Sequence, residues 1–90
     1  MNVTWDEAKR QKTLQDRGLD FADTQILFAG PVFEDARRDY GERRMICYGW
    51  LAGRLAVVGY VPRGDSRHVF TMRKANEREI QKFAQRFGPG

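Results

Sequence analysis

The residue types best suited to chemistry gather between positions 63 and 79. This segment holds five of the sixteen basic residues and the only histidine of the 90-residue chain. Guanidinium and ammonium groups bind phosphate, and an imidazole exchanges protons near neutral pH. The segment therefore predicts a site that grips phosphates and moves protons, which is what RNA cleavage without a metal ion requires. The residues concerned are Arg63, Arg67, His68, Arg73, Lys74 and Arg78.

Residues 67–73 are predicted to form a strand. Regular alternation would place Arg67 and Arg73 on one face, roughly 20 Å apart at about 3.3 Å per residue. His68 and Lys74 would fall on the other face. The two arginines would then span several phosphates of an RNA strand. Two alternatives stay open: incidental arginines on a solvated strand face, and a structural role for His68.

Arg73 and Lys74 come directly before a predicted helix. Asn76 is its expected N-cap, and Glu79 completes a capping-box pattern three residues later. Free amide donors and the positive end of the helix dipole favour anions at such a terminus. A phosphate would fit there; the alternative is charge on a surface turn.

Residues 33–42 are polar and charged, and we expect them to form a loop. Glu42, at the end of this loop, is a candidate general base. The alternative is a solvated ion pair with a neighbouring arginine, which is worth about 0–1 kcal/mol.

Charge is unevenly distributed along the chain. Residues 1–42 hold six basic and nine acidic side chains, a net charge of −3, whereas residues 43–90 hold ten basic and three acidic ones, a net charge of +7. A basic second half predicts a polyanion or an acidic protein as the partner. The length and the 41% hydrophobic content predict one globular domain, residues 1–90.

The sequence lacks the residues that several classes of function require. There is no apolar run of about 20 residues, no His/Cys cluster for zinc and no Gly-rich loop followed by Lys-Ser/Thr. A set of spaced acids for two metal ions is not evident either. We therefore expect no metal, no cofactor and no membrane span. Cys47 is the single cysteine, which fits a reducing cytoplasm and a buried strand position.

Hydrophobic periodicity and turn residues predict the order strand, helix, helix, strand, strand, strand, helix. The ranges are 1–5, 7–17, 21–29, 44–50, 55–61, 67–73 and a last helix after Asn76. Asp6 and Asp20 are the expected N-caps of the first two helices, and Ile26 is expected on the buried side of the second. Contiguous strands favour hairpins, so we expect an α+β domain with a small antiparallel sheet flanked by helices.

Short segments in a fixed order point to a known family. They are Trp5-Asp6-Glu7-Ala8-Lys9, Arg17-Gly18-Leu19-Asp20-Phe21, Phe28-Ala29-Gly30-Pro31, residues 39–44, Arg63-Gly64-Asp65 and residues 72–79. Over nearly its whole length the chain resembles the BrnT toxins, the ribonuclease partners of BrnA antitoxins in bacterial type II toxin–antitoxin pairs. The resemblance implies a fold similar to that of RelE-type toxins and a cytoplasmic endoribonuclease that needs no metal and arrests translation.

The resemblance also implies protein and nucleic-acid partners. RNA would be the substrate, and the antitoxin would carry a ribbon-helix-helix DNA-binding domain. Toxin and antitoxin would form a tight complex, a heterotetramer, which binds operator DNA through the antitoxin and represses its own operon.

Together, the residues and the resemblance predict a mechanism in which the RNA 2′-hydroxyl attacks the adjacent phosphorus. Glu42 or His68 would be the base, and Tyr60 or a lysine the acid. The remaining roles are charge stabilisation by Arg67, Arg73 and Lys74, and RNA binding by Lys9, Arg44, Arg63 and Arg78.

A second hypothesis from another class remains open. In it, the basic surface holds an acidic protein segment or nucleic acid without cutting it. Both hypotheses predict binding that weakens with salt, so cleavage products are what distinguish them.

Overall fold

The computed structural model describes residues 2–39 and 41–87. In this part of the chain it contains a five-stranded sheet, three α-helices and one short 3-10 helix. The strands are β1 (Asn2–Trp5), β2 (Val32–Asp39), β3 (Glu42–Leu51), β4 (Arg54–Arg63) and β5 (Ser66–Lys74). The helices are α1 (Glu7–Arg17), the 3-10 helix η1 (Phe21–Asp23), α2 (Thr24–Ala29) and α3 (Glu77–Phe87).

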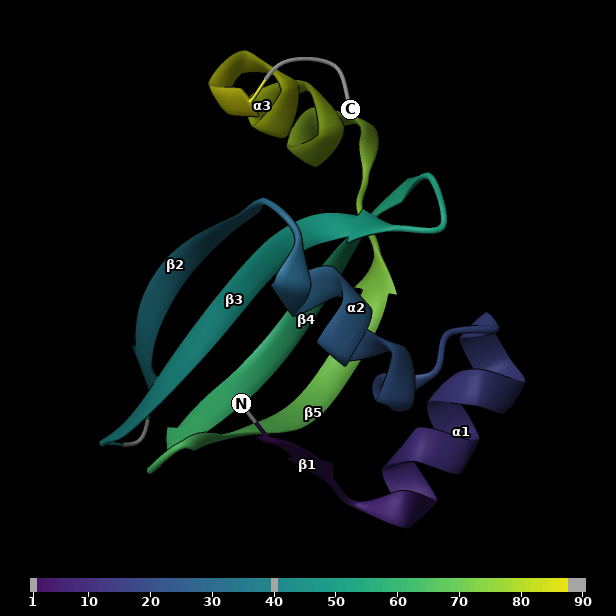
Figure 1. Ribbon diagram of the computed structural model, residues 1–90, viewed down its shortest axis with the longest axis vertical. Helices are drawn as coiled ribbons and strands as arrows, with labels where there is room; N and C mark the ends of the chain where they lie inside the picture. The colour runs from purple at the N-terminus through teal and green to yellow at the C-terminus, as the bar shows by residue number, and fades with distance from the viewer. Residues whose placement is uncertain (1, 40, 88–90) are drawn as a thin grey trace.

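The strands follow the order β1-β5-β4-β3-β2 across the sheet (Figure 1). The four strands from β2 to β5 form an antiparallel meander. β1 lies at the other edge and pairs with β5 in parallel. The α+β class is therefore confirmed, but the sheet is mixed rather than purely antiparallel.

Strand β2 corrects the expected loop at residues 33–42. Val32–Asp39 pairs with β3 over eight residues, from Val32↔Gly49 to Asp39↔Glu42. Polar residues dominate it because β2 is an edge strand, and residues 36–38 are exposed to solvent. The element order therefore contains one more strand than the sequence indicated.

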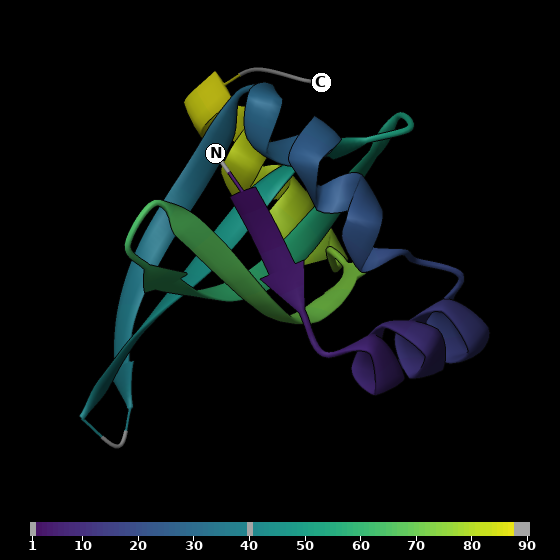
Figure 2. The same ribbon diagram turned by 60° about the horizontal axis from the view of Figure 1, so that its bottom comes forward.

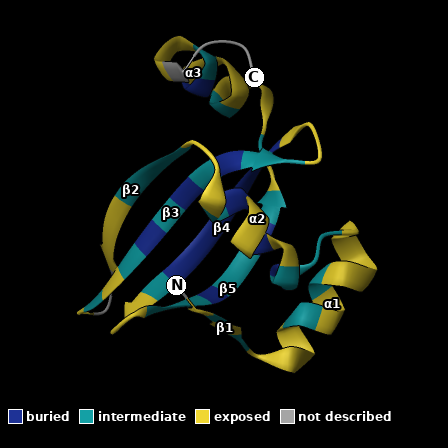
Figure 3. Cartoon of the chain, viewed as in Figure 1, coloured by how far each residue is buried: buried dark blue, intermediate teal, exposed yellow. Residues whose placement is uncertain are grey.

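The main core lies between one face of the sheet, called here the first face, and the segment formed by η1 and α2. Its buried residues come from η1, α2 and strands β3 to β5 (Figure 3). They are Phe21, Leu27, Met45, Cys47, Ala56, Val58, Tyr60, Val69 and Met72. The opposite side, the second face, carries Tyr48 and Trp50 of β3, which alternate with the buried Met45 and Cys47.

A β-bulge in β5 changes which residues share a face. Gly59 pairs with Thr71, but the next residue, Tyr60, pairs with Val69, so Phe70 is an extra residue. The bulge reverses the alternation. Arg67 consequently lies on the first face and Arg73 on the second, and the expectation that they share a face is wrong.

Gly59 is required at this position because the second face is crowded above it. A Cβ at Gly59 would lie 2.6 Å from the Thr71 Cγ2 atom and 2.8 Å from the Phe70 Cζ atom. The ring of Phe70 therefore occupies the space over the glycine on the second face.

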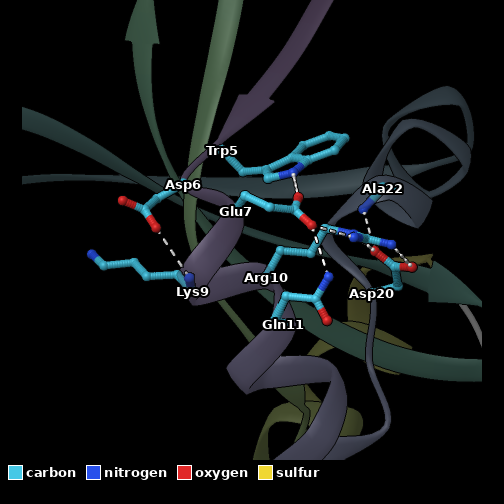
Figure 4. Close-up of polar contacts among 8 residues, drawn as sticks. All are labelled: Trp5, Asp6, Glu7, Lys9, Arg10, Gln11, Asp20 and Ala22. Carbon is cyan, nitrogen blue, oxygen red and sulfur yellow. Dashed lines mark hydrogen bonds and ion pairs between the residues drawn. The ribbon is translucent and has the colours of Figure 1, made fainter.

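Helix α1 has no buried residue and is attached by polar contacts. Asp6 caps it by accepting from the backbone N–H of Lys9 (Figure 4). The Arg10 guanidinium donates to both carboxylate oxygens of Asp20, at 2.8 and 3.1 Å, and also to Glu7. These contacts link α1 to the start of η1, and they lower the pKa of Asp20.

The second predicted helix is divided into η1 and α2. Asp20 caps η1 through the backbone N–H of Ala22, as expected. Phe21 and Leu27 are buried, whereas Ile26 is 64% exposed, so its expected burial is wrong. The 3-10 turn shifts the helical phase, so residues predicted from one continuous helix do not all point to the core.

Helix α3 lies at one end of the sheet, on the opposite side from α2 (Figure 2). The predicted capping box is confirmed, because Asn76 and Glu79 each accept from the other's backbone N–H, at 2.9 and 3.0 Å. Phe83 is buried and its ring meets that of Trp50 edge-on at 5.5 Å. No helix in the described ranges is long and apolar enough to cross a bilayer.

Candidate functional site

The candidate residues of the second face lie in three rows of side chains that cross the strands, about 6.6 Å apart along each strand. The first row is Phe33, Tyr48, Val57 and Arg73. The middle row is Asp35, Ile46, Gly59 and Thr71. The third row contains Arg37 and Arg44 from β2 and β3, then Val61, His68 and Thr4.

The bulge brings His68 and Arg73 onto the same face. Five positions separate them, and regular alternation would place residues at an odd separation on opposite faces. Because Phe70 is the extra residue, His68 pairs with Val61 and Arg73 with Val57, and both partners belong to the second face.

Arg73 is held at the end of the first row by Glu79. Its two terminal nitrogens donate to the two carboxylate oxygens of Glu79, each at 2.8 Å. These bonds lower the pKa of Glu79 to about 2, with smaller contributions from the Asn76 backbone and the Tyr48 hydroxyl. Burial raises the pKa of Tyr48, and the nearby Glu79 carboxylate adds to the effect.

A groove of about 160 Å³ lies between this end of the sheet and α3. Its walls combine aromatic rings with cations and two carboxylates. The lining residues are Phe33, Asp35, Arg37, Tyr48, Arg78, Glu79, Lys82, Phe83 and Arg86. The guanidinium of Arg86 lies 4.3 Å from the centre of the Phe33 ring. Aromatic faces beside guanidinium groups are the surroundings that unstacked RNA bases and their phosphates require.

The third row holds the histidine and a second arginine. The Thr4 hydroxyl lies 2.9 Å from Nδ1 of His68, which links β1 to β5. The Arg44 guanidinium lies over the Phe70 ring, 5.0 Å from its centre, and its Nε is 3.7 Å from a Glu42 carboxylate oxygen. His68, Arg44 and Glu42 thus provide an imidazole, a guanidinium and a carboxylate at one end of the second face.

Arg67 lies in a different environment, on the first face. Its guanidinium is 4.2 Å from the Phe28 ring centre and 5.2 Å from that of Tyr60, and 3.7 Å from a Glu34 oxygen. The Tyr60 hydroxyl donates to Glu34 at 2.9 Å. Burial and this hydrogen bond raise the pKa of Tyr60 to about 12. Arg67 and Tyr60 therefore have packing partners in the core region and do not face the groove.

The remaining predicted site residues are dispersed. Lys74 is exposed. It belongs to the first face, because it pairs with Ala56, a residue of that face. Lys9 is exposed on α1, and Arg63 is exposed at the end of β4. Arg78 is exposed in the first turn of α3 and lines the groove. The second face thus brings together Glu42, Arg44, His68, Arg73 and Arg78, and not Lys9, Arg67 or Lys74.

Several groove residues were missed in the sequence. Tyr48 follows the alternation of Arg44 and Ile46, which is a usable signal for the second face. Arg37 was not placed because β2 was taken for a loop. Lys82 and Arg86 reach the groove only through the tertiary position of α3, which no local pattern indicates.

Two further observations concern metal and thiol chemistry. In residues 2–39 and 41–87, no group of three or more His, Cys, Asp or Glu side chains could hold a metal ion. Cys47 is fully buried, and burial raises the pKa of its thiol to about 12.

The fold and this face define a small α+β protein with one apolar sheet face and one basic, aromatic sheet face. Residues 5–79 match the model of a family described as ribonuclease toxin, BrnT, of type II toxin-antitoxin system. The chain belongs to the BrnT family, which confirms the resemblance drawn from its sequence. An antitoxin protein is the partner that a type II toxin implies. Neither the curated proteins nor the solved structures gave a match.

Proposed function

We propose that this chain is a metal-independent endoribonuclease whose site is the second face of the sheet. The observation that carries the proposal is the β5 bulge, which puts His68 and Arg73 on one face beside aromatic rings. A single RNA strand can then lie across the rows, with a base in the groove and phosphates near the arginines. Arg67 and Lys74 have no part in this site because they belong to the first face.

The reaction proposed is internal transesterification. The RNA 2′-oxygen attacks the adjacent phosphorus, the bond from phosphorus to the 5′-oxygen breaks, and a 2′,3′-cyclic phosphate and a 5′-hydroxyl result. His68 or Glu42 takes the proton of the 2′-hydroxyl, and water returns one to the leaving oxygen. Arg44 stabilises the charge that develops on the phosphate, and Arg73 holds a neighbouring phosphate.

Glu79 has a positioning role in this proposal. Its carboxylate is engaged by both terminal nitrogens of Arg73 and by the Asn76 backbone N–H. With a pKa of about 2 it stays ionised, so it orients the arginine and does not exchange protons at neutral pH.

Cleavage of a single-stranded RNA in EDTA tests this proposal. We expect the variant that lacks the base, His68→Ala or Glu42→Gln, to lower the rate by about 100-fold or more, and Arg73→Ala to lower it by about 10-fold. Arg54→Ala, which removes an exposed arginine at the start of β4, serves as the matched control with unchanged cleavage. Lys74→Ala should also leave cleavage unchanged, although the sequence predicts that Lys74 lies in the site.

Three results would overturn the proposal. Cleavage by His68→Ala, Glu42→Gln and Arg73→Ala at the wild-type rate would move the site off the second face. Loss of activity in EDTA with recovery on adding Mg²⁺ would contradict metal independence. Binding of RNA without any products, even with ribosomes added, would favour a non-catalytic module.

We further propose that the antitoxin is a BrnA-like ribbon-helix-helix protein, which neutralises the toxin in the bacterial cytoplasm. The complex would be a heterotetramer that binds operator DNA through the antitoxin. The reading frame adjacent to this one is the first place to look for it. Co-purification of its product with this chain, followed by an operator shift assay, tests the pairing.

A further inference from the structure

Two hollows meet around the end of the sheet formed by the β3–β4 turn, the first on the side of α2 and the second on the side of α3. The first, of about 730 Å³, lies between that turn and the segment from α1 to α2. The second, of about 340 Å³, continues to the start of α3 and is lined by Ile80. Arg54, Leu55 and Lys74 line both hollows, so the two form one continuous surface, called here the docking surface.

Apolar side chains are exposed along the docking surface. Ile26 in the first hollow is 64% exposed and Ile80 in the second is 37% exposed. In the described chain only three large hydrophobic residues are exposed, and these are two of them. Leu19 and Leu51 also line the first hollow and add apolar area to it. Clustering of this kind marks a surface that another molecule covers.

The charge of the docking surface indicates the chemistry of that molecule. Arg54 and Lys74 lie where the hollows meet, and neither forms an ion pair within the described residues. Two carboxylates also line the first hollow. Asp20 is already bound by Arg10 at 2.8 Å. This leaves Asp23 against the three cations of the lining, Arg17, Arg54 and Lys74. Two cations without acidic partners between apolar walls favour a segment that alternates aliphatic and acidic side chains.

We propose that the docking surface binds an acidic, aliphatic segment of the antitoxin. The inference rests on the proposed antitoxin pairing and adds where the partner binds. One apolar anchor would fill the space beside Ile26, a second would meet Ile80, and carboxylates between them would pair with Arg54 and Lys74. A segment that reaches Ile80 ends at the helix that carries Arg78, so it brings negative charge to the edge of the RNA-binding groove.

Two other occupants fit the surface less well. RNA requires rings on which bases stack; among the described residues, the first hollow has no aromatic residue in its lining, and the second has one, Trp50, whose ring already packs edge-on against Phe83. A second copy of the chain in a symmetric pair would bring Arg54 and Lys74 close to their own equivalents, and like charges would repel.

The test uses the full chain and the protein encoded by the adjacent reading frame, with binding measured by titration calorimetry. Ile26→Glu and Arg54→Glu should each weaken binding by about 10-fold or more. The matched controls are Leu14→Glu, an exposed leucine on α1, and Lys12→Glu, an exposed lysine on α1, and both should bind as the wild type does. RNA cleavage by Ile26→Glu and Arg54→Glu should be unchanged.

The possible failures can be told apart. If the adjacent protein binds the wild type and both surface variants equally, the docking surface is wrong and the antitoxin pairing stands. If it does not bind the wild type, the pairing fails and the inference falls with it. Loss of RNA binding, or of self-association, in the surface variants would assign the surface to one of the other occupants and overturn the proposal.

Discussion

Arg73 and Glu79 join the last strand to the last helix through two parallel hydrogen bonds of 2.8 Å. The same carboxylate also accepts from the backbone N–H of Asn76 as part of the capping box. One glutamate therefore fixes the start of α3 and the orientation of the arginine. Bidentate guanidinium–carboxylate pairs hold both groups in a defined plane, so Arg73 has a fixed orientation against Glu79, which lines the groove.

This pair predicts a specific loss of stability in acid. The pKa of Glu79 falls from 4.5 to about 2 on folding, so its contribution is full above about pH 4.5 and is lost as the pH falls through about 2. Because the Arg73 side chain is 43% exposed, we expect the contribution to be about 1–3 kcal/mol. Glu79→Gln should remove it, as measured by urea unfolding at a series of pH values.

The informative quantity is the difference between wild type and Glu79→Gln, since other carboxylates titrate in both. That difference should shrink as the pH drops from 4.5 to 2. A constant difference across this range would mean that the Glu79 charge is not stabilised by Arg73 in the folded protein.

The two tyrosines beside the strands should behave differently when their hydroxyls are removed. Tyr48→Phe takes a hydroxyl from the groove and should lower RNA cleavage by about 10-fold, the value of one hydrogen bond, with little change in melting temperature. Tyr60→Phe leaves the Glu34 acceptor without its donor and should cost about 1–3 kcal/mol of stability. The folded Tyr60→Phe protein should still cleave RNA. If Tyr60→Phe abolished cleavage and Tyr48→Phe did not change it, Tyr60 would again be the candidate acid.

Gly59 should tolerate no side chain. In Gly59→Ala the new methyl group would lie within 3 Å of Phe70 and Thr71, and overpacking of this kind costs about 1–3 kcal/mol. Displacement of the Phe70 ring should also disturb Arg44 and slow cleavage. Gly30→Ala is the matched control, because its nearest neighbour would be 3.8 Å away. Equal melting temperatures for the two variants would show that the second face is not packed over Gly59.

Helix α1 should open more readily than the sheet. It buries no side chain, and Arg10 is its main attachment to η1. Arg10→Met keeps the aliphatic length but removes the bonds to Asp20, so amide exchange along α1 should accelerate by about 10-fold while β4 stays protected. Lys12→Met, which removes an exposed pair with Asp16, should leave exchange unchanged. Uniform exchange across both elements would show that α1 unfolds only with the whole domain.

The sequence predicted the elements that have strong local signals. Asp6 and the Asn76–Glu79 capping box marked two helix starts correctly, since caps act within one turn. The apolar run at 55–61 lies within β4, the central strand of the sheet. Strand β2 was missed because an edge strand exposed to solvent carries the same polar residues as a loop.

The candidate site was predicted less completely, for a geometric reason. The sequence shows which residue types are present in the site. Which of them lie on the same face of the sheet depends on one extra residue in β5. Regular alternation predicted that Arg67 and Arg73 lie on the same face. Because of the bulge, His68 and Arg73 lie on the same face instead. A bulge depends on the register with the neighbouring strand, and only Gly59 hinted at it.

Arg73 and Lys74 are neighbours in the chain that serve opposite faces of the sheet. If the second face cuts RNA and the docking surface, which Lys74 lines, binds the inhibitor, adjacent codons are under selection from two different molecules. A substitution at Lys74 can then alter the choice of inhibitor while Arg73 keeps its bonds to Glu79. New toxin–antitoxin specificities can arise by point mutation in this strand without loss of toxicity, so related pairs within one genome can become insulated from each other.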